Sequence, residues 1–465
     1  MTSTEDRPGN ADETPAQRWR RTVRVSADGG GFAYRAGELI IDAAAKEALA
    51  NAVDGNLGDI VELDDGLLLA VGVTDELGVA ETLRAEGFSA HPNHLLFAAN
   101  VVQAHPTLWA HPTLWAHPTL WAHPTLWPHP TLWPHPSAPG AAGGGCSCCC
   151  EGGASAPRGC GPTAPVAQPS VPVQSSVDLT RSEPALLRKG KGPGGTISVV
   201  VLDTGLDQAV AAAGNAQISI RNQELWGPTK PGEFTDHVDH PDDDNNRWLD
   251  PVAGHGTFIA GLVARLAPAT DDTVGKVLES TGEGNDADLA FRINRLADTG
   301  APDILVLSCS CYTDDDLEPP ALTKAVARIQ AKGTLVVAAA GNEATCRVSW
   351  PSALPGVIAV GALGPDGPAP FTNYGSWVTA CAPGVDIVSR FFDGVDVHDD
   401  GDPATADFRG WAKWSGTSFS APIVAAAIAR EAALYGISIA DAVQRVVLDP
   451  RLFRIPGLGT VVNLH

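Results

Sequence analysis

Four short apolar runs in the second half of the chain constrain its fold most. Each run has four to six residues, is made of valine, isoleucine, leucine and alanine almost throughout, and contains no charged residue, as in strands buried on both faces of a parallel sheet. Helical runs alternate with them, so the pattern predicts an α/β domain with a doubly wound, mainly parallel sheet. The expected strands are Ile197–Leu202, Ile304–Leu307, Leu335–Ala340 and Val357–Val360, and the expected helices include Thr257–Arg265, Ala321–Ala331 and Ser418–Leu434.

Four polar residues stand near glycines where these strands end or these helices begin. Asp203 directly follows the first apolar run, and Asn342 follows the third after a glycine. His255 lies between two glycines before a helical run, and Ser418 opens another. Singly, such residues are explained as a surface histidine, a turn asparagine or a helix N-cap serine. Because functional groups gather at the carboxyl ends of parallel strands, the joint pattern favours one shared site.

Ser418 has the surroundings of a nucleophile. It lies in Gly416-Thr417-Ser418-Phe419-Ser420-Ala421-Pro422, and the apolar run that follows predicts a helix with Pro422 in its first turn. The small neighbours leave the hydroxyl uncovered. Unpaired N–H groups at the helix N-terminus favour the negative charge of an attacking oxygen or of an oxyanion.

Three further motifs make the pattern specific. Asp203-Thr204-Gly205, His255-Gly256-Thr257 and Ala340-Gly341-Asn342, with the segment around Ser418, resemble the subtilisin (subtilase) family of serine endopeptidases. The chain order Asp, His, Ser is that of subtilisins and not of chymotrypsin-like enzymes or α/β-hydrolases. The resemblance implies a subtilisin-like peptidase domain over residues 178–465.

The resemblance also assigns roles. Ser418 would attack the carbonyl of a protein or peptide substrate and form an acyl-enzyme, while His255 transfers the proton. Asp203 would orient His255, and Asn342 with the Ser418 N–H would hold the oxyanion. This mechanism requires no cofactor and no catalytic metal. A catalytically inactive, protease-like scaffold that binds a protein partner is the alternative function.

The same matching implies where a peptide substrate binds. The family's Ser-Leu-Gly strand, which pairs with an extended peptide, corresponds to Ser308, Cys309 and Ser310. One wall of the pocket for the residue before the scissile bond would be formed by Ala338, Ala339, Ala340 and Gly341. The chain departs from the family pattern at Cys309 and Ser310, and at Phe258, where many members carry a second histidine.

Nine cysteines divide into two groups. Within the peptidase domain, Cys311 and Cys346 resemble a disulfide pair of mycosin-type subtilases; the alternative is that all four thiols of this domain are reduced and buried. The other five, between Cys146 and Cys160, indicate either a thiol-rich linker or a soft-metal or redox site.

Residues 22–103 are expected to form a small α+β, ferredoxin-like domain. The segments Gly37-Glu38-Leu39-Ile40-Ile41 and Pro92-Asn93-His94 resemble the inhibitory propeptide domain of subtilases. The resemblance implies a zymogen whose own N-terminal domain is its inhibitor and folding chaperone; an unrelated ferredoxin-like module is the alternative. The expected elements are Phe32–Ile41, Ala43–Val53, Asp59–Leu63, Leu67–Val73, Asp75–Glu86 and Ser89–Phe97.

Two segments lack the pattern of folded elements. Residues 1–21 are polar and aperiodic, which predicts a disordered tail. Residues 104–177 hold five copies of His-Pro-Thr-Leu-Trp, starting at His105, followed by a linker rich in glycine, alanine, proline and serine. The repeat is interpreted as a spacer, as an aromatic edge that docks on a protein groove, or as a metal site formed by its histidines.

The charge and hydropathy of the chain limit the kinds of partner that it is expected to bind. The formal net charge of −23 argues against binding to nucleic acid or to an anionic membrane. The N-terminus lacks the apolar core of a signal peptide and no run approaches the length of a membrane span, so the expected location is cytoplasmic, with export by a non-classical route as the alternative. The acidic run 236–250 is interpreted as a solvated loop, with a structural calcium site as the alternative.

A rival enzyme class also has to be weighed, because Asp-Thr-Gly occurs at Asp203 and again at Asp298. Aspartic proteases use two such triplets, one from each β-rich lobe. Here the second triplet follows the helical run Ala290–Ala297, where Gly300 is expected to be a C-cap, and the surrounding pattern is α/β. The sequence therefore disfavours this class.

Overall fold

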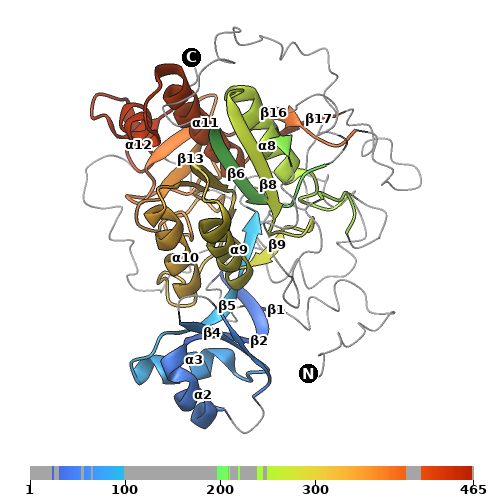
Figure 1. The fold of residues 1–465 in the computed structure, drawn as a ribbon, viewed down its shortest axis with the longest axis vertical. Coiled ribbons are helices and arrows are strands. Elements are labelled where there is room, and N and C mark those ends of the chain that lie inside the picture. The colour runs from blue at the N-terminus through green and yellow to red at the C-terminus, as the bar shows by residue number, and fades with distance from the viewer. Residues whose placement is uncertain are drawn as a thin grey trace, which may run out of the picture.

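The computed structural model describes residues 23–25, 31–53, 57–63, 66–98, 196–207, 209, 218–219, 238–243, 249–393 and 410–462. The expected tail (1–21) and the repeat and linker (104–177), with their cysteine cluster, lie outside these residues. Figure 1 shows a large unit and, below it, a smaller N-terminal unit.

A ten-stranded sheet forms the centre of the large unit, with strand order β18-β19-β15-β13-β12-β10-β6-β8-β7 and with β14 beside β13. The pairs from β19 to β7 are parallel, whereas β18 and β14 pair antiparallel. The sheet therefore confirms the expected α/β architecture. Its strands are β6 (Ile197–Asp203), β7 (Ile218–Ser219), β8 (Thr270–Lys276), β10 (Ile304–Leu307), β12 (Leu335–Ala339), β13 (Ile358–Gly364), β14 (Gly367–Pro368), β15 (Ala380–Pro383), β18 (Arg454–Ile455) and β19 (Gly459–Val461).

Helices cover both faces of this sheet, because successive side chains of each buried strand point to opposite sides. In β6, Val199 and Val201 join the apolar cluster under α8 (His255–Leu266) and α11 (Thr417–Tyr435). Val200 and Leu202 join the cluster under α9 (Asp286–Thr299) and α10 (Pro320–Ala331). Full burial of each such side chain stabilises the fold by about 1.5–3 kcal/mol.

The central helix α11 is apolar on nearly all sides because it is buried almost throughout its length. A short helix, α12 (Ile439–Val443), and the helical segment Gln444–Leu448 follow it. Among the described residues, no single helix has the length and apolar composition of a membrane span. Taken together, α11 and the segment 439–448 meet that criterion by length and composition, although they are bent by 118°.

The N-terminal unit follows the expected order of strand, helix, strand, strand, helix, strand. Its strands pair antiparallel in the order β5-β2-β4-β3, with β1 beside β2. The apolar cluster between the sheet and its two helices forms the core of the unit. The elements are β1 (Val23–Val25), β2 (Ala33–Asp42), α2 (Lys46–Ala52), β3 (Ile60–Glu62), β4 (Leu67–Val71), α3 (Glu76–Ala85) and β5 (Ala90–Ala98), with a 3-10 turn, Ala43–Ala45, before α2.

The last strand of the N-terminal unit, β5, extends into the large unit (Figure 1). Its end pairs antiparallel with β9 (Glu283–Asn285) on one side and with β11 (Cys309–Ser310) on the other. The Ala98 N–H also donates to the Gly282 carbonyl at 3.2 Å. One continuous strand therefore belongs to the sheets of both units.

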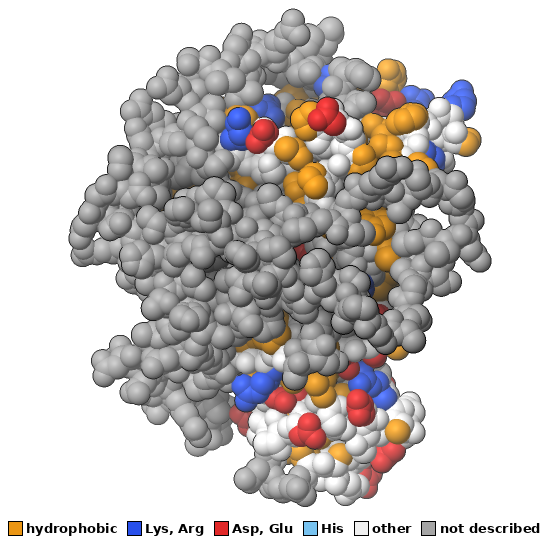
Figure 2. All heavy atoms as spheres, turned by 180° about the vertical axis from the view of Figure 1, so that it is seen from behind, with side chains coloured by type: hydrophobic (Ala, Val, Ile, Leu, Met, Phe, Trp, Pro, Cys, Tyr) orange, Lys and Arg blue, Asp and Glu red, His pale blue; other side chains and the backbone are white. Residues whose placement is uncertain are grey.

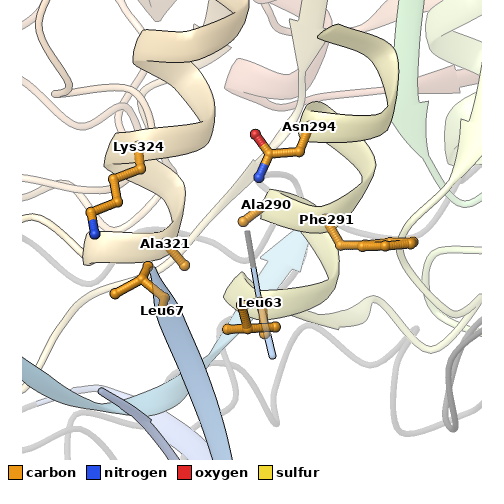
Figure 3. Close-up of a pocket in the computed structure, with 8 residues that line it drawn as sticks. Leu63, Leu67, Ala290, Phe291, Asn294, Ala321 and Lys324 are labelled. Atoms are coloured by element: carbon orange, nitrogen blue, oxygen red, sulfur yellow. The ribbon is translucent and has the colours of Figure 1, made fainter. Parts of the chain in front are cut away.

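The N-terminal sheet also packs on α9 and α10. Its residues Ile40, Leu67 and Leu96 belong to the same buried apolar cluster as the inner faces of those two helices. Figure 3 shows Leu63 and Leu67 beside Ala290 and Ala321, lining a small gap in this contact. On the face seen from behind, the described surface of the N-terminal unit carries both acidic and basic side chains (Figure 2).

Candidate active site

The sequence-predicted residues all lie at the carboxyl edge of the central sheet. Asp203 ends β6, His255 begins α8, and Asn342 follows β12 by three residues. Ser418 is the second residue of α11. Asp203, His255 and Ser418 are each 0% exposed. The structure thus places four residues from four separate segments where a doubly wound sheet concentrates its functional groups.

His255 is held by Asp203. The His255 Nδ1 atom lies 2.6 Å from Asp203 Oδ1, which also accepts the backbone N–H of Thr204 at 2.8 Å. Because an ionised carboxylate only accepts hydrogen bonds, this contact places the imidazole proton on Nδ1 and leaves Nε2 with a lone pair. The Nε2 atom has no hydrogen-bond partner among the described residues.

The glycines on either side of His255 are required by close contacts. Gly254 has φ 81°, and a Cβ there would collide with the ring of Phe391. A Cβ on Gly256 would collide with the carbonyl oxygen of Gly205. The Gly256 N–H donates to Thr204 Oγ1 at 2.9 Å. The helix therefore starts close against the Asp203-Thr204-Gly205 turn, which keeps His255 within reach of Asp203.

Aromatic side chains surround the His255 ring. Trp414 and Phe419 meet it edge to face, with ring centroids 5.5 and 5.4 Å away. Phe258, at the position where many relatives carry a histidine, packs against Phe419 at 4.5 Å and Trp414 at 5.9 Å. The cluster fixes the imidazole plane and excludes water from one side of it. Trp414 lies two residues before the Ser418 motif and Phe419 lies within it, but neither was predicted to belong to the site.

Two reciprocal pairs of hydrogen bonds hold the start of α11. Ser308 Oγ donates to the Ser418 carbonyl at 3.0 Å, and Ser418 Oγ donates to the Ser308 carbonyl at 3.2 Å. The Thr417 N–H donates to Asn342 Oδ1 at 2.9 Å, and the Gly341 N–H donates to Thr417 Oγ1 at 3.1 Å. Because Asn342 Oδ1 accepts the Thr417 N–H, Nδ2 is the end of the amide suited to an oxyanion.

A second carboxylate, Asp239, positions the loop that carries His255. It accepts the Gly254 N–H at 3.0 Å and the Thr257 hydroxyl at 2.9 Å. Burial raises the pKa of Asp239 to about 7, although these hydrogen bonds lower it. Asp239 belongs to the acidic run 236–250, whose described carboxylates also include Asp243, which accepts from Lys276 and Ser280. Carboxylates of the acidic run therefore accept hydrogen bonds from other protein groups and do not face solvent alone.

One of the two segments expected to bind a peptide pairs with β5. Cys309 and Ser310 form β11 and pair with Ala98 and Phe97, and Ser308 immediately precedes that strand. The pocket-wall residues Ala338, Ala339 and Ala340 are each 0% exposed. Gly341 has φ 103°, and a Cβ there would collide with Asn373 and Glu343. The strand of the N-terminal unit thus lies along the edge that the resemblance assigns to substrate.

The expected disulfide between Cys311 and Cys346 is wrong: the structure does not join these two residues. Cys311 is 3% exposed, and its backbone is fixed by an antiparallel bridge to Trp350, four positions beyond Cys346. Cys346 lies instead beside Trp377, whose indole N–H donates to the Cys346 carbonyl at 3.2 Å. Burial raises the pKa of the Cys311 thiol well above its usual range, so it behaves as an inert, protonated core residue.

The second Asp-Thr-Gly triplet lies away from this arrangement. Asp298 and Thr299 belong to the last turn of α9, and Gly300 is its C-cap, as expected. The Asp298 side chain is 48% exposed and pairs with Arg328 of α10 at 2.7 Å. A surface carboxylate paired with an arginine does not match the shared-proton pair of an aspartic protease.

Comparison with known proteins identifies the family of the chain. The model of the subtilase family matches residues 194–449, more than half of the chain. A thermophilic serine proteinase of Bacillus sp. (strain AK1) is 33% identical over 285 residues, 58% of this chain and 59% of that protein. Halolysin of Haloferax mediterranei is 31% identical over 215 residues, 44% of this chain and 38% of that protein. The chain thus spans less than two thirds of the length of these curated relatives.

Among solved structures, the protease domain of PatA aligns with 59% of this chain and 94% of its own length, at 24% identity and a TM-score of 0.47. The family assignment rests on the family model, which covers every segment from β6 to the end of α11. The chain belongs to the subtilase family.

Proposed function

We propose that the chain is a serine endopeptidase that hydrolyses peptide bonds through an acyl-enzyme and is made as an autoinhibited zymogen. The observation that carries the activity is the 2.6 Å contact between Asp203 and His255 Nδ1. It fixes the tautomer in which Nε2 accepts a proton, and the structure shows no other partner for Nε2 among the described residues.

Ser418 is the nucleophile of this mechanism. Its hydroxyl makes one long hydrogen bond, of 3.2 Å to the Ser308 carbonyl, so rotation to another staggered rotamer breaks only a weak contact. After that rotation, His255 Nε2 takes the hydroxyl proton while Oγ attacks the scissile carbonyl, and the same nitrogen later returns the proton to the leaving amine. Asp203 stays ionised and stabilises the imidazolium.

The oxyanion forms beside the N-terminus of α11. The backbone N–H of Ser418 and the Asn342 amide donate to it, and the helix dipole favours its negative charge. A peptide substrate pairs with the edge strand at Ser308, Cys309 and Ser310, where β5 pairs in the structure, and its side chain before the scissile bond faces Ala338–Gly341.

Replacement of Asn342 tests the oxyanion role. In Asn342→Ala we expect kcat to fall by about 10²–10³-fold, the range measured for this role in subtilisin, with KM little changed, because the donor acts only once the oxyanion forms. Asn342→Asp is the matched control for structure, since it keeps an oxygen for the Thr417 N–H but removes the donor. Steady-state kinetics on a chromogenic peptide should show similar losses in both. Full activity in Asn342→Asp would contradict the role.

The zymogen proposal rests on β5. In the full chain this strand lies between β9 and β11 and fills the edge that a substrate needs. The ferredoxin-like N-terminal unit, proposed to span residues 22–103, shares a buried cluster with α9 and α10, so it also supplies apolar surface on which the peptidase domain can fold. We propose that it is both the chaperone and the inhibitor.

A chain that begins near residue 178 tests this second role. We expect it to refold more slowly than the full chain and, once folded, to be inhibited by residues 22–103 added separately. Ala98→Pro in the added domain removes the N–H donated to Gly282, so inhibition should weaken by about 2- to 10-fold, as expected from the loss of about 0.5–1.5 kcal/mol. The assay is the recovery of peptide hydrolysis after dilution from denaturant. Equal refolding of both chains, with full activity in excess domain, would show an unrelated module instead.

A further inference from the structure

One buried histidine of the N-terminal unit points at the peptidase domain without a hydrogen bond. His91, on β5, is 6% exposed, and its Nδ1 atom has no hydrogen-bond partner in the part of the chain that the structure describes. That atom lies 4.0 Å from Asp314 Oδ1 and 3.9 Å from Asp315 Oδ2, both in the loop after β11. These separations are too long for hydrogen bonds, yet the nitrogen is nearly equidistant from two carboxylate oxygens.

His91 lies beside a cluster of charged side chains. Three carboxylates gather there, those of Asp286, Asp314 and Asp315, with Arg84 bonded to the last two at 2.9 and 3.1 Å. His94 lies 3.3 Å from Asp314 and 3.5 Å from Asp286; burial lowers its pKa, but these two neighbours raise it to about 9. Arg84 and His94 thus pair with these carboxylates, and burial raises the pKa of Asp286, which contacts His94.

His91 itself is a neutral imidazole at neutral pH. Burial lowers its pKa to about 4, in spite of the nearby carboxylates. A neutral imidazole nitrogen is a common ligand for transition metals, and carboxylate oxygens complete such sites. Each carboxylate has about four lone-pair directions, so Asp314 and Asp315 can bind a cation while they still accept from Arg84 and His94.

We propose that His91, Asp314 and Asp315 form a binding site for one divalent transition-metal ion of the Zn²⁺ type, which links the N-terminal unit to the peptidase domain. Their ligand atoms all lie within 4.8 Å of one another. Bonds of about 2.1 Å in a tetrahedral site place ligands roughly 3.4 Å apart, so closing the site takes shifts of up to about 0.7 Å at each ligand. A water molecule supplies the fourth ligand, and Arg84 holds the carboxylates from outside.

The site contains residues of both units, so ion binding should stabilise the contact between them. His91 comes from β5, whereas both aspartates come from the peptidase domain, so the three ligands meet only when β5 is docked. An ion that binds only this docked form stabilises it by mass action. The inference concerns metal binding and does not depend on the proposed peptidase activity.

The experiment uses the full chain carrying Ser418→Ala, which keeps both units in one uncleaved protein. After treatment with a chelator, thermal unfolding is followed with and without Zn²⁺. We expect Zn²⁺ at about a hundred times its Kd to raise Tm by roughly 5 °C or more. Any Zn²⁺ taken up by the cysteines between Cys146 and Cys160 is expected to bind the unfolded chain as well, because these residues are close in sequence, so it should add little to the shift.

Three further replacements in that background locate the ion. His91→Gln removes the nitrogen ligand, and Asp315→Asn removes an oxygen ligand from a side chain that is 23% exposed, so the packing of the contact is kept. Both should abolish the zinc-dependent rise. Asp316→Asn is the matched control: it removes the adjacent carboxylate, which pairs with Arg347, at a φ of 59° that asparagine tolerates. It should keep the rise. No rise in the Ser418→Ala chain, or an equal rise in His91→Gln and Asp315→Asn, would overturn the proposal.

Discussion

Ser418→Ala is expected to lower kcat by about 10⁶-fold, the loss measured when subtilisin, a member of the same family, loses its serine. The change removes the hydroxyl that His255 is proposed to activate at the N-terminus of α11. It should leave the fold intact, because the lost hydrogen bond to Ser308 is long, at 3.2 Å, and contributes about 0.5–1.5 kcal/mol. Steady-state hydrolysis of a chromogenic peptide measures the loss.

Ser420→Ala is the matched control for that change. Ser420 lies two residues later in the same helix, is also 0% exposed, and donates to the carbonyls of Ala382 and Pro383 at 3.0 and 3.1 Å. Its removal should reduce stability by about the same amount while kcat stays within a few-fold of the starting value. Residual hydrolysis in purified Ser418→Ala, or an equally large loss in Ser420→Ala, would argue that the serine acts only in structure.

Asp203→Asn is expected to have the second largest effect and to lower kcat by about 10⁴-fold. An asparagine amide in place of the carboxylate can donate to His255 Nδ1. The imidazole proton then moves to Nε2, which can no longer accept the Ser418 proton. The fold should persist, because the side chains have the same shape and an oxygen remains for the Thr204 N–H, at 2.8 Å from Asp203 Oδ1.

The neighbouring strand provides a control for the loss of a buried carboxylate. Asp272 lies on β8, opposite Val199 of β6, and is also 0% exposed. Burial raises the pKa of Asp272 to about 8, so at pH 7 it is already largely protonated and Asp272→Asn changes little in its charge. The kcat of Asp272→Asn should stay close to that of the unaltered enzyme. A kcat within tenfold of the original in Asp203→Asn would contradict the orienting role.

The sequence predicted the fully buried strands of the central sheet and four residues that the structure places at its carboxyl edge. Strands such as Ile304–Leu307 are buried on both faces, so an uninterrupted apolar run is their signature. The position of His255 is confined by its glycines, since a Cβ at Gly254 would collide with Phe391 and one at Gly256 with the turn that follows Asp203. Where two segments approach this closely, the position requires glycine, and a glycine can be recognised from the sequence alone.

Polar strands and long-range contacts could not be predicted in the same way. The strand β8 contains Asp271, Asp272 and Lys276, so it lacks the apolar run, yet it pairs with the whole of β6. The expected Cys311–Cys346 disulfide came from resemblance alone, and the structure does not join these two residues. The contact of β5 with β9 and β11 joins segments far apart in the chain, which no local pattern encodes.

Covalent labelling by a fluorophosphonate probe tests the central claim most directly, because such probes react with a serine only when a base activates it and an oxyanion site receives the phosphoryl oxygen. The protein is labelled after removal of its N-terminal domain, and the modified peptide is identified by mass spectrometry. The account predicts one label, on Ser418, that is absent from Ser418→Ala and strongly reduced in Asp203→Asn. Absence of any label on the processed protein, or labelling that persists in Ser418→Ala, would contradict it.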